Sequence, residues 1–373
     1  MSTIKVDEIY GDEPTDAVDL PNKLKIGGVS VEQGYTASGS EPSSPSNGDF
    51  WWDTGNDKLY RYMDGEFKEL GVAAGGSWFG ARALFMGGYT TEAATNLVTI
   101  EYVAPATTGN VTDFGDLTVG RTDGGACCNG TRAIYSGGYA NAGLQNVIDY
   151  VTTATTGNAT DFGDMSEASS GMAALSDGTK GIIAGGYYAT TAAIVNRIEF
   201  VTIDTAGNMA DFGDMLTTDR RQAGTSDATR GLIAGSDNTA NTIQYITTAS
   251  AGNAVDFGDL TQVTKKLAGA SDATRSLFMG GETSGSPYRS NVISYVTTQT
   301  AGNATDFGDL TQQVETPSGT NDDIYAVRGG GGTASGRTNV IDRVTIQTAG
   351  NASDFGDLSG SNLGVRATSG AAS

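Results

Sequence analysis

The chain has 373 residues, a net charge of −21 and no histidine. Glycine, with 54 residues, is about twice as frequent as in average proteins, while proline, with 7, is scarce. The glycines follow no G-X-Y period, which excludes a collagen-like repeat. The negative charge argues against a protein that binds nucleic acid through its phosphates. No stretch reaches the ~18 apolar residues of a membrane helix. Without histidine, the chain lacks the side chain that most often serves as a general base or zinc ligand.

The first 33 residues are predicted to form short extended segments, as in "MSTIKVDEIYG" and "LPNKLKIGGVSV". They contain no apolar core of a secretory signal, so we predict none. Residues 34–48 are rich in Ser, Pro and Gly, and we predict a linker that is too polar to pack a core.

Residues 49–73 are predicted to form a three-stranded, Trp-rich module. The strands are expected at 50–52, 59–62 and 67–70, with an Asp-Gly hairpin turn before the last. About 22 residues cannot bury large aromatic side chains unaided. We therefore expect another copy of the module or a larger assembly to cover its aromatic residues, with packing against the rest of the chain as the alternative. These candidate oligomer or attachment residues are Trp51, Trp52, Tyr60 and Tyr62.

The remaining residues, 74–373, carry one motif six times. Asp-Phe-Gly-Asp begins at Asp113, Asp161, Asp211, Asp256, Asp306 and Asp354, at intervals of 45 to 50 residues. A period of this length built from strands is typical of propeller blades. We predict an all-β, six-bladed propeller with repeats ending at 117, 165, 215, 260, 310 and 358, and keep a β-solenoid as the alternative.

Each repeat contains four strand-like pieces. In the fifth copy they lie at 265–274, 275–282, 291–298 and 302–310, the last following a Gly-Asn turn. A glycine pair ends the second piece, at 87–88, 137–138, 185–186, 280–281 and 329–330, and we expect it near a central channel. The C-terminal segment 363–373 matches a first strand, which the first repeat lacks, so we predict that it closes the fold.

The Asp-Phe-Gly-Asp motif also occurs in other contexts. A single Asp-Phe-Gly beside a catalytic loop would suggest a kinase, but six copies in a β-repeat do not. The nearby asparagines match a glycosylation sequon, yet a turn explains them better. We interpret the motif as a turn whose phenylalanine packs between blades, and keep a weak calcium site at Asp161, Asp164 and their repeat equivalents as an alternative. The adjacent Cys127 and Cys128 are predicted to be small strand residues.

At this point the chain resembles a known group of proteins. "GDFWWDTGNDKLYRYMDGEFKEL" (48–70) is similar to modules of phage tail fibres, and the opening segment resembles N-termini of virion structural proteins of marine and cyanobacterial phages. The repeat "NVIDYVTTATTGNATDFGDM" (146–165) resembles their kelch-like units. The resemblance implies a virion protein that is made in the host cytoplasm and attaches through residues 1–73 to other virion proteins. The Trp-rich hairpin together with the linker favours a homotrimer. The resemblance carries over no catalytic residues, and the copper oxidase chemistry of some kelch propellers does not transfer to a chain without histidine.

The loops between second and third strands and the connections between blades are expected to share one face. They vary most between repeats, and they carry aromatic and basic residues suited to host-surface polysaccharide. The candidates are Tyr139, Tyr187, Tyr188, Tyr288, Arg289, Arg121, Arg220, Arg221, Lys265 and Lys266. Solvated loops are the alternative reading for any one of them.

Three functions follow from this reading. The first is a phage fibre or appendage protein for receptor binding and host attachment, and the second is a purely structural capsid-decoration or tail-assembly protein. The third, a glycan-degrading enzyme, would need paired carboxylates, and setting aside the equivalent repeated aspartates leaves few unique acids, among them Glu101, Glu199, Glu282 and Glu315. We predict no catalysis, no cofactor, no nucleic-acid partner and no membrane insertion.

Overall fold

The computed structural model describes residues 25–26, 29–30, 35–44, 50–53, 58–63, 66–69, 80–90, 95–107, 109–238 and 240–370. The chain divides into two compact units, Met1–Gly76 (unit 1) and Ser77–Ser373 (unit 2), three residues later than the predicted boundary. All regular structure in these residues is β-strand, which confirms the all-β class. None of the described segments is a helix long and apolar enough for a membrane crossing.

Unit 1 contains a four-stranded sheet where the sequence predicts three strands. β4 (Phe50–Asp53), β5 (Lys58–Met63) and β6 (Glu66–Glu69) form the predicted antiparallel meander. The additional strand, β3 (Tyr35–Ser38), pairs parallel with β4. The linker prediction is therefore wrong for these residues, because Tyr-Thr-Ala is more strand-forming than the Ser/Pro-rich remainder.

The predicted N-terminal arm lies largely outside the described residues. Within it, β1 (Lys25–Ile26) pairs antiparallel with β2 (Val29–Ser30). The Asp-Gly turn predicted in the Trp-rich module also falls outside the described residues.

Unit 2 contains six four-stranded antiparallel sheets among its described residues. Listed from first to fourth strand, sheet 1 consists of β42 (Arg366–Gly370), β7 (Arg82–Met86), β10 (Thr99–Val103) and β11 (Thr112–Asp116), and sheet 2 of β13 (Gly125–Cys128), β14 (Arg132–Ser136), β17 (Val147–Thr152) and β18 (Thr160–Asp164). Sheet 3 consists of β20 (Ala173–Ser176), β21 (Lys180–Ala184), β24 (Arg197–Thr202) and β25 (Ala210–Asp214), and sheet 4 of β26 (Ala223–Ser226), β27 (Arg230–Ala234), β28 (Thr242–Thr247) and β29 (Val255–Asp259). Sheet 5 consists of β31 (Ala268–Ser271), β32 (Arg275–Met279), β34 (Ser290–Thr297) and β35 (Thr305–Val314), and sheet 6 of β36 (Ser318–Asn321), β37 (Tyr325–Gly329), β40 (Val340–Thr345) and β41 (Ser353–Asp357).

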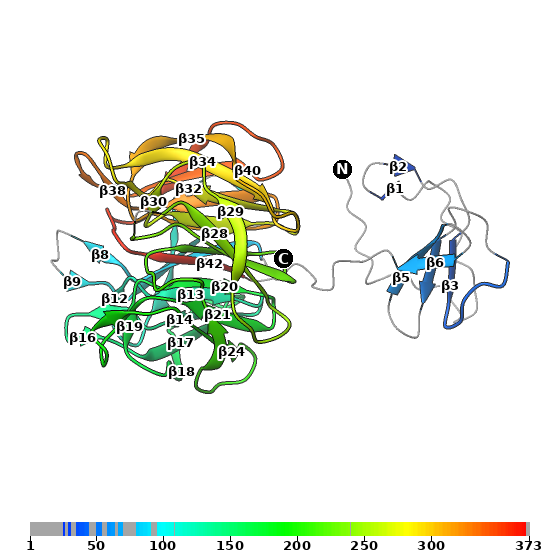
Figure 1. The fold of residues 1–373 in the computed structure, drawn as a ribbon, viewed down its shortest axis with the longest axis horizontal. Coiled ribbons are helices and arrows are strands. Elements are labelled where there is room, and N and C mark those ends of the chain that lie inside the picture. The colour runs from blue at the N-terminus through cyan, green and yellow to red at the C-terminus, as the bar shows by residue number, and fades with distance from the viewer. Residues whose placement is uncertain are drawn as a thin grey trace. The chain divides into compact units, whose positions relative to one another are not determined.

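The C-terminal strand completes sheet 1, as the sequence predicts. β42 pairs antiparallel with β7 from Arg366 opposite Met86 to Gly370 opposite Arg82. Figure 1 shows β42, in red, in the middle of unit 2 near β13, which it contacts. The two ends of unit 2 are thus hydrogen-bonded within one sheet, which leaves β7 without an open edge.

The first strands of the six sheets lie next to one another. β13 contacts β42 and β20, β26 contacts β20 and β31, and β36 contacts β31 and β42. The apolar clusters lie between neighbouring sheets: Phe114 of sheet 1 packs with Tyr135 of sheet 2 and meets the Tyr102 ring edge-on at 5.9 Å. This confirms that the motif phenylalanine packs between repeats.

The Asp-Phe-Gly-Asp motif lies in the fourth strand of each sheet rather than in a turn. Its glycine sits beside a β-bulge and faces the next repeat: a Cβ on Gly163, at φ 149°, would meet the Gly207 carbonyl oxygen at 2.3 Å. Close approach of two backbones, not a tight turn, therefore requires this glycine.

The asparagine of each Gly-Asn pair links two sheets. Asn208 Oδ1 accepts the backbone N–H of Asp164 at 3.0 Å. The same contact joins all six pairs of neighbouring sheets, through Asn158 and Asp116, Asn253 and Asp214, Asn303 and Asp259, Asn351 and Asp309, and Asn110 and Asp357. The conspicuous repeat motif is thus a device that joins sheets.

A second set of links lies at the turn end, the end of unit 2 that carries the turns between first and second strands. Arg230 donates from Nη1 to the Thr298 carbonyl of the next sheet at 3.3 Å, and its guanidinium stacks 4.4 Å from the Tyr245 ring centre. Each other sheet also reaches the next through a cation, from Arg82 to Thr153, Arg132 to Ile203, Lys180 to Thr248, Arg275 to Ile346 and Arg343 to Pro105.

The glycine pairs lie where each second strand ends, rather than beside a central channel. Gly137 and Gly138 have φ values of 59° and 103°, and the Gly138 N–H donates to the Ser169 carbonyl at 2.8 Å. In the sixth repeat the pair is shifted by one residue from the prediction, to Gly330 and Gly331, since Gly329 still pairs within β37.

Candidate binding face

The loops between second and third strands meet the connections between sheets at one end of unit 2, which we call the loop face. Their short strands pair with each other. β15 (Tyr139–Ala140) pairs with both β12 (Arg121–Thr122) and β16 (Gly143–Leu144), and β22 (Tyr187–Tyr188) pairs with both β19 (Ser169–Ser170) and β23 (Ala193–Ile194). β30 (Thr264–Lys265) pairs with β33 (Glu282–Thr283). The hairpins β8 (Tyr89–Thr90)–β9 (Thr95–Asn96) and β38 (Gly332–Thr333)–β39 (Gly336–Arg337) lie in two further loops. Figure 1 shows β8, β9, β12, β16, β19 and β38 along one side of unit 2. The pairing confirms that these segments share a face.

One position of the loop face follows a left-handed glycine pair in five of the six repeats and has a changing side chain. It is the residue after each glycine pair, or after Gly235-Ser236, and in sheets 2, 3 and 5 it pairs with the connection to the next sheet. In sheets 1 to 3 this residue is Tyr89, Tyr139 or Tyr187, and in sheets 4 to 6 it is Asp237, Glu282 or Gly332. The loop face therefore has an aromatic half and a charged half.

The aromatic half presents tyrosine rings near arginines. Tyr139 is 51% exposed. Arg337 lies 4.4 Å from the centre of the Tyr89 ring, and Arg220 lies 5.8 Å from that of Tyr187. A ring held in this way offers a flat surface on which an apolar face of a ligand can stack.

The charged half is a continuous network of five cations and three carboxylates across sheets 4 to 6, which we call the ion-pair ladder. Neighbouring members lie 2.6–3.5 Å apart. In order the ladder runs from Arg220 and Arg221 through Asp237, Lys265, Glu282, Lys266 and Glu315 to Arg289. Five of the predicted binding residues are thus brought together.

Three members of the ladder have pKa values shifted in favour of their charged forms. Burial favours a raised pKa for Asp237, but hydrogen bonds from Lys265 and Arg220 outweigh it and hold the pKa at about 2. Burial is likewise outweighed at Glu282, whose pKa is lowered by the Lys266 ammonium. The hydrogen bond to Asp237 raises the pKa of Lys265.

One loop of the charged half carries an exposed aromatic residue. Tyr288 is 63% exposed and directly precedes Arg289, whose Nη2 donates to Glu315 at 2.7 Å. Thr283 Oγ1 fastens the same loop by donating to the carbonyls of Gly285 and Pro287 at 3.0 and 2.6 Å. Tyr288 therefore projects from an anchored loop.

Two predicted binding residues are wrong, because they are buried. Arg121 is 0% exposed and pairs with Asp149 at 2.6 Å beneath the loop face. Tyr188 is 1% exposed and donates from its hydroxyl to Glu199 at 3.2 Å. Arg121 lies in a connection between sheets and Tyr188 in a loop, but both side chains point into the interior.

Trp51 is buried within the chain itself, whereas the sequence predicts that a partner covers it. It is 7% exposed, and its indole N–H donates to the carbonyl and hydroxyl oxygens of Ser38, both at 3.1 Å. The unforeseen strand β3 provides this cover. Trp52, Tyr60 and Tyr62 lie in β4 and β5, and their side chains are outside the described residues.

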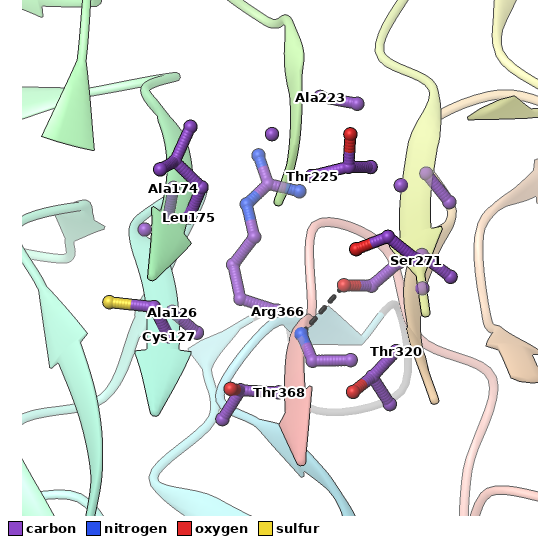
Figure 2. A pocket seen from close by; sticks show the side chains of 18 of the residues that line it. Ala126, Cys127, Ala174, Leu175, Ala223, Thr225, Ser271, Thr320, Arg366 and Thr368 are labelled. Atoms are coloured by element: carbon purple, nitrogen blue, oxygen red, sulfur yellow. Dashed lines mark hydrogen bonds between the residues drawn. The ribbon is translucent and has the colours of Figure 1, made fainter. Parts of the chain in front are cut away.

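The six first strands enclose a central cavity of about 110 Å³. Small residues line it, including Ala126, Cys127 and Thr225, and Figure 2 shows the long side chain of Arg366 among them. Arg366 is held by Asp123 at 3.1 Å and by the Gly124 carbonyl at 2.8 Å. The cavity is smaller than the ~300 Å³ typical of ligand pockets.

Cys127 and Cys128 are buried in β13, as expected of small strand residues. Burial raises the pKa of both thiols, which keeps them protonated.

The calcium alternative gains no support from the motif's geometry. The Asn side-chain oxygens, including that of Asn208 beside Asp164, accept backbone N–H groups instead of facing a cation. Among the described residues, no three acidic, histidine or cysteine side chains gather as metal ligands would.

The four glutamates considered for catalysis have other contacts and do not form an isolated pair of facing carboxylates. Glu282 and Glu315 belong to the ion-pair ladder, and Glu199 accepts from Tyr188. Burial raises the pKa of Glu101, which is hydrogen-bonded to Ser359.

Sequence reasoning missed the role of Asp237 as the ladder's first junction. A signal was present, because Asp237 and Glu282 each follow the first residue of a basic pair, Arg220 or Lys265, by 17 residues. An acid at one fixed register position opposite a basic pair predicts a cross-strand ion pair.

No protein-family model matches this chain, and no curated protein matches it in sequence.

Proposed function

We propose that unit 2 is a six-bladed, kelch-like β-propeller whose loop face binds polysaccharide on a host surface. The propeller proposal is supported by the contacts of the first strands, in which β42 touches both β36 and β13. It is also supported by the asparagine links, which recur at all six junctions between sheets. A closed ring would give the loop face a rigid frame.

The observation that carries the binding proposal is the position after the glycine pair. A left-handed glycine pair precedes it in five of the six repeats, and the position holds tyrosines in three sheets and other side chains in the other three. Structural positions in this chain repeat their side chains, as the motif asparagines do, whereas this position diversifies. Aromatic rings and cations on a fixed frame suit sugar stacking and recognition of polar sugar substituents.

The place of action is part of the proposal. We place the chain in a phage particle as a fibre or appendage protein, following the resemblance of its N-terminal segments and repeats to virion proteins. Unit 1, a separate compact unit, would attach to other virion proteins and support a homotrimer. The chain would act as a binding protein rather than as an enzyme.

A purely structural role in capsid decoration or tail assembly is the second candidate. The burial of Trp51 within its own unit favours it, since that side chain then needs no second copy as a cover. In this role the loop face would be covered by other virion subunits, and it would bind no polysaccharide.

The test measures binding of the full chain to immobilised bacterial surface polysaccharides. Tyr139→Ala and Tyr288→Ala are each expected to weaken the binding about tenfold, the loss of roughly 1.4 kcal/mol. Ile324→Ala is the matched control, because Ile324 is a similarly exposed apolar side chain (58%) at the turn end. Equal losses in all three variants, or no binding to any polysaccharide, would contradict the proposal.

A further inference from the structure

We infer that the ion-pair ladder, with Tyr288, is a subsite for an acidic saccharide, a sugar that carries a carboxylate such as a uronate. The inference rests on the proposed polysaccharide binding and adds the chemical class and location of the ligand. It commits to the charged half of the loop face, between sheets 4 and 6.

The first argument is local charge. The ladder contains five cations and three carboxylates in a chain whose net charge is −21. Asp219 adds a fourth carboxylate, because it accepts the backbone N–H groups of Arg220 and Asp237 at 2.8 and 2.9 Å, which leaves one cation more than carboxylates. At physiological ionic strength, charges more than ~8 Å away are largely screened. A ligand on the ladder therefore meets a local positive excess.

The second argument is unused hydrogen-bonding capacity. An arginine has five N–H donors and a lysine three. Arg289 donates to Glu315 through Nη2, and its Nε is buried, which leaves Nη1 as the donor for a ligand. Arg221 reaches Asp237 through one contact of 3.4 Å. A carboxylate can accept two parallel N–H groups from a guanidinium, so it matches these remaining donors better than a neutral sugar hydroxyl does.

The third argument is that the backbone fixes the cations in advance. Arg221 and Lys266 have left-handed φ values of 62° and 54°. Each N–H donates to the corresponding residue of the preceding sheet, Arg221 to the Gly171 carbonyl at 2.6 Å and Lys266 to the Arg221 carbonyl at 2.7 Å. The same left-handed position recurs in the other connections, at Asp123, Gly171, Thr316 and Gly364, so it belongs to the repeat, and it holds the backbone of the two neighbouring cations in place before a ligand binds.

The fourth argument is the adjacent ring. Tyr288 stands exposed beside Arg289 on a loop that Thr283 anchors. A pyranose stacked on the Tyr288 ring would place a ring carboxylate within reach of the neighbouring guanidinium. Stacking and charge pairing would then select one kind of sugar unit, and the ladder's further cations, Lys266 and Lys265, could pair with the next units of a polymer.

The test uses the full chain in 150 mM NaCl, with polygalacturonate and hyaluronate as probes and their neutral methyl esters as matched controls. Calorimetry is expected to show at least one acidic polymer binding tenfold or more tightly than its own ester. Arg289→Gln combined with Lys266→Gln should remove this preference. Lys180→Gln, which neutralises a partly buried cation at the turn end, should leave it within twofold.

Tyr288→Ala tests the stacking contact separately from the charge pairing. Because Tyr288 is exposed, the variant should stay folded, and it should weaken binding of acid and ester alike. Equal binding of acid and ester overturns the acidic-saccharide inference while polysaccharide binding stands. No binding of either polymer also overturns it, and binding to the bacterial polysaccharide panel then decides the proposed function separately. A preference for acid that survives the double variant would place the subsite elsewhere.

Discussion

At the residue scale, the most frequent motif of the chain serves packing between repeats. The glycine of Asp-Phe-Gly-Asp lies against the backbone of the following Gly-Asn pair, and the asparagine hydrogen-bonds the motif's last aspartate. From sequence, glycine and asparagine indicate turns, because both tolerate left-handed backbone. Their actual role depends on a neighbour some 45 residues away, which no local pattern reveals.

The two kinds of glycine in this repeated contact should differ sharply in their tolerance of alanine. A Cβ on Gly163 would meet the Gly207 carbonyl oxygen at 2.3 Å, whereas a Cβ on Gly157 would meet nothing within 4 Å. We expect Gly163→Ala to lower the free energy of unfolding by about 2 kcal/mol and Gly157→Ala by less than about 0.5 kcal/mol. Urea unfolding followed by circular dichroism measures both, and equal stability of the two variants would show that the close approach is absent.

At the element scale, the sequence predicts the strands of unit 2 well. The period of the motif and the apolar second strand recur in every repeat, so six copies reinforce one local pattern. The C-terminal first strand could be predicted because the first repeat visibly lacks that piece. β3 could not, since it is four residues long and pairs with β4 across a polar segment.

The β42 strand should be essential for the cooperative folding of unit 2. Removing residues 363–373 exposes the edge of β7 and deletes the Arg366 contacts to Asp123 and Gly124. We expect the truncated chain to lose its cooperative thermal transition and to aggregate, as judged by circular dichroism and light scattering. A synthetic peptide of residues 363–373 should restore part of the transition, whereas an unchanged melting curve without it would refute the role of β42.

At the scale of the whole molecule, repetition separates structural positions from variable ones. The asparagines that join sheets are the same in every repeat, while the position after the glycine pair changes from tyrosine to acid to glycine. Sequence could locate this variable face, because loops and connections alternate in a known order along the chain. It could not show that Arg121 and Tyr188 turn inward, since burial there depends on Asp149 and Glu199 of other strands.

The central claim is that the loop face, rather than the turn end or unit 1, contacts polysaccharide. Hydrogen exchange of the full chain, with and without the bacterial polysaccharide that it binds most tightly, measures this directly. We expect added protection in the loops around 236–242 and 282–290 and unchanged exchange in the turns at 227–229 and 272–274. Protection confined to those turns or to residues 35–69, or no protection at the loop face, would contradict the claim.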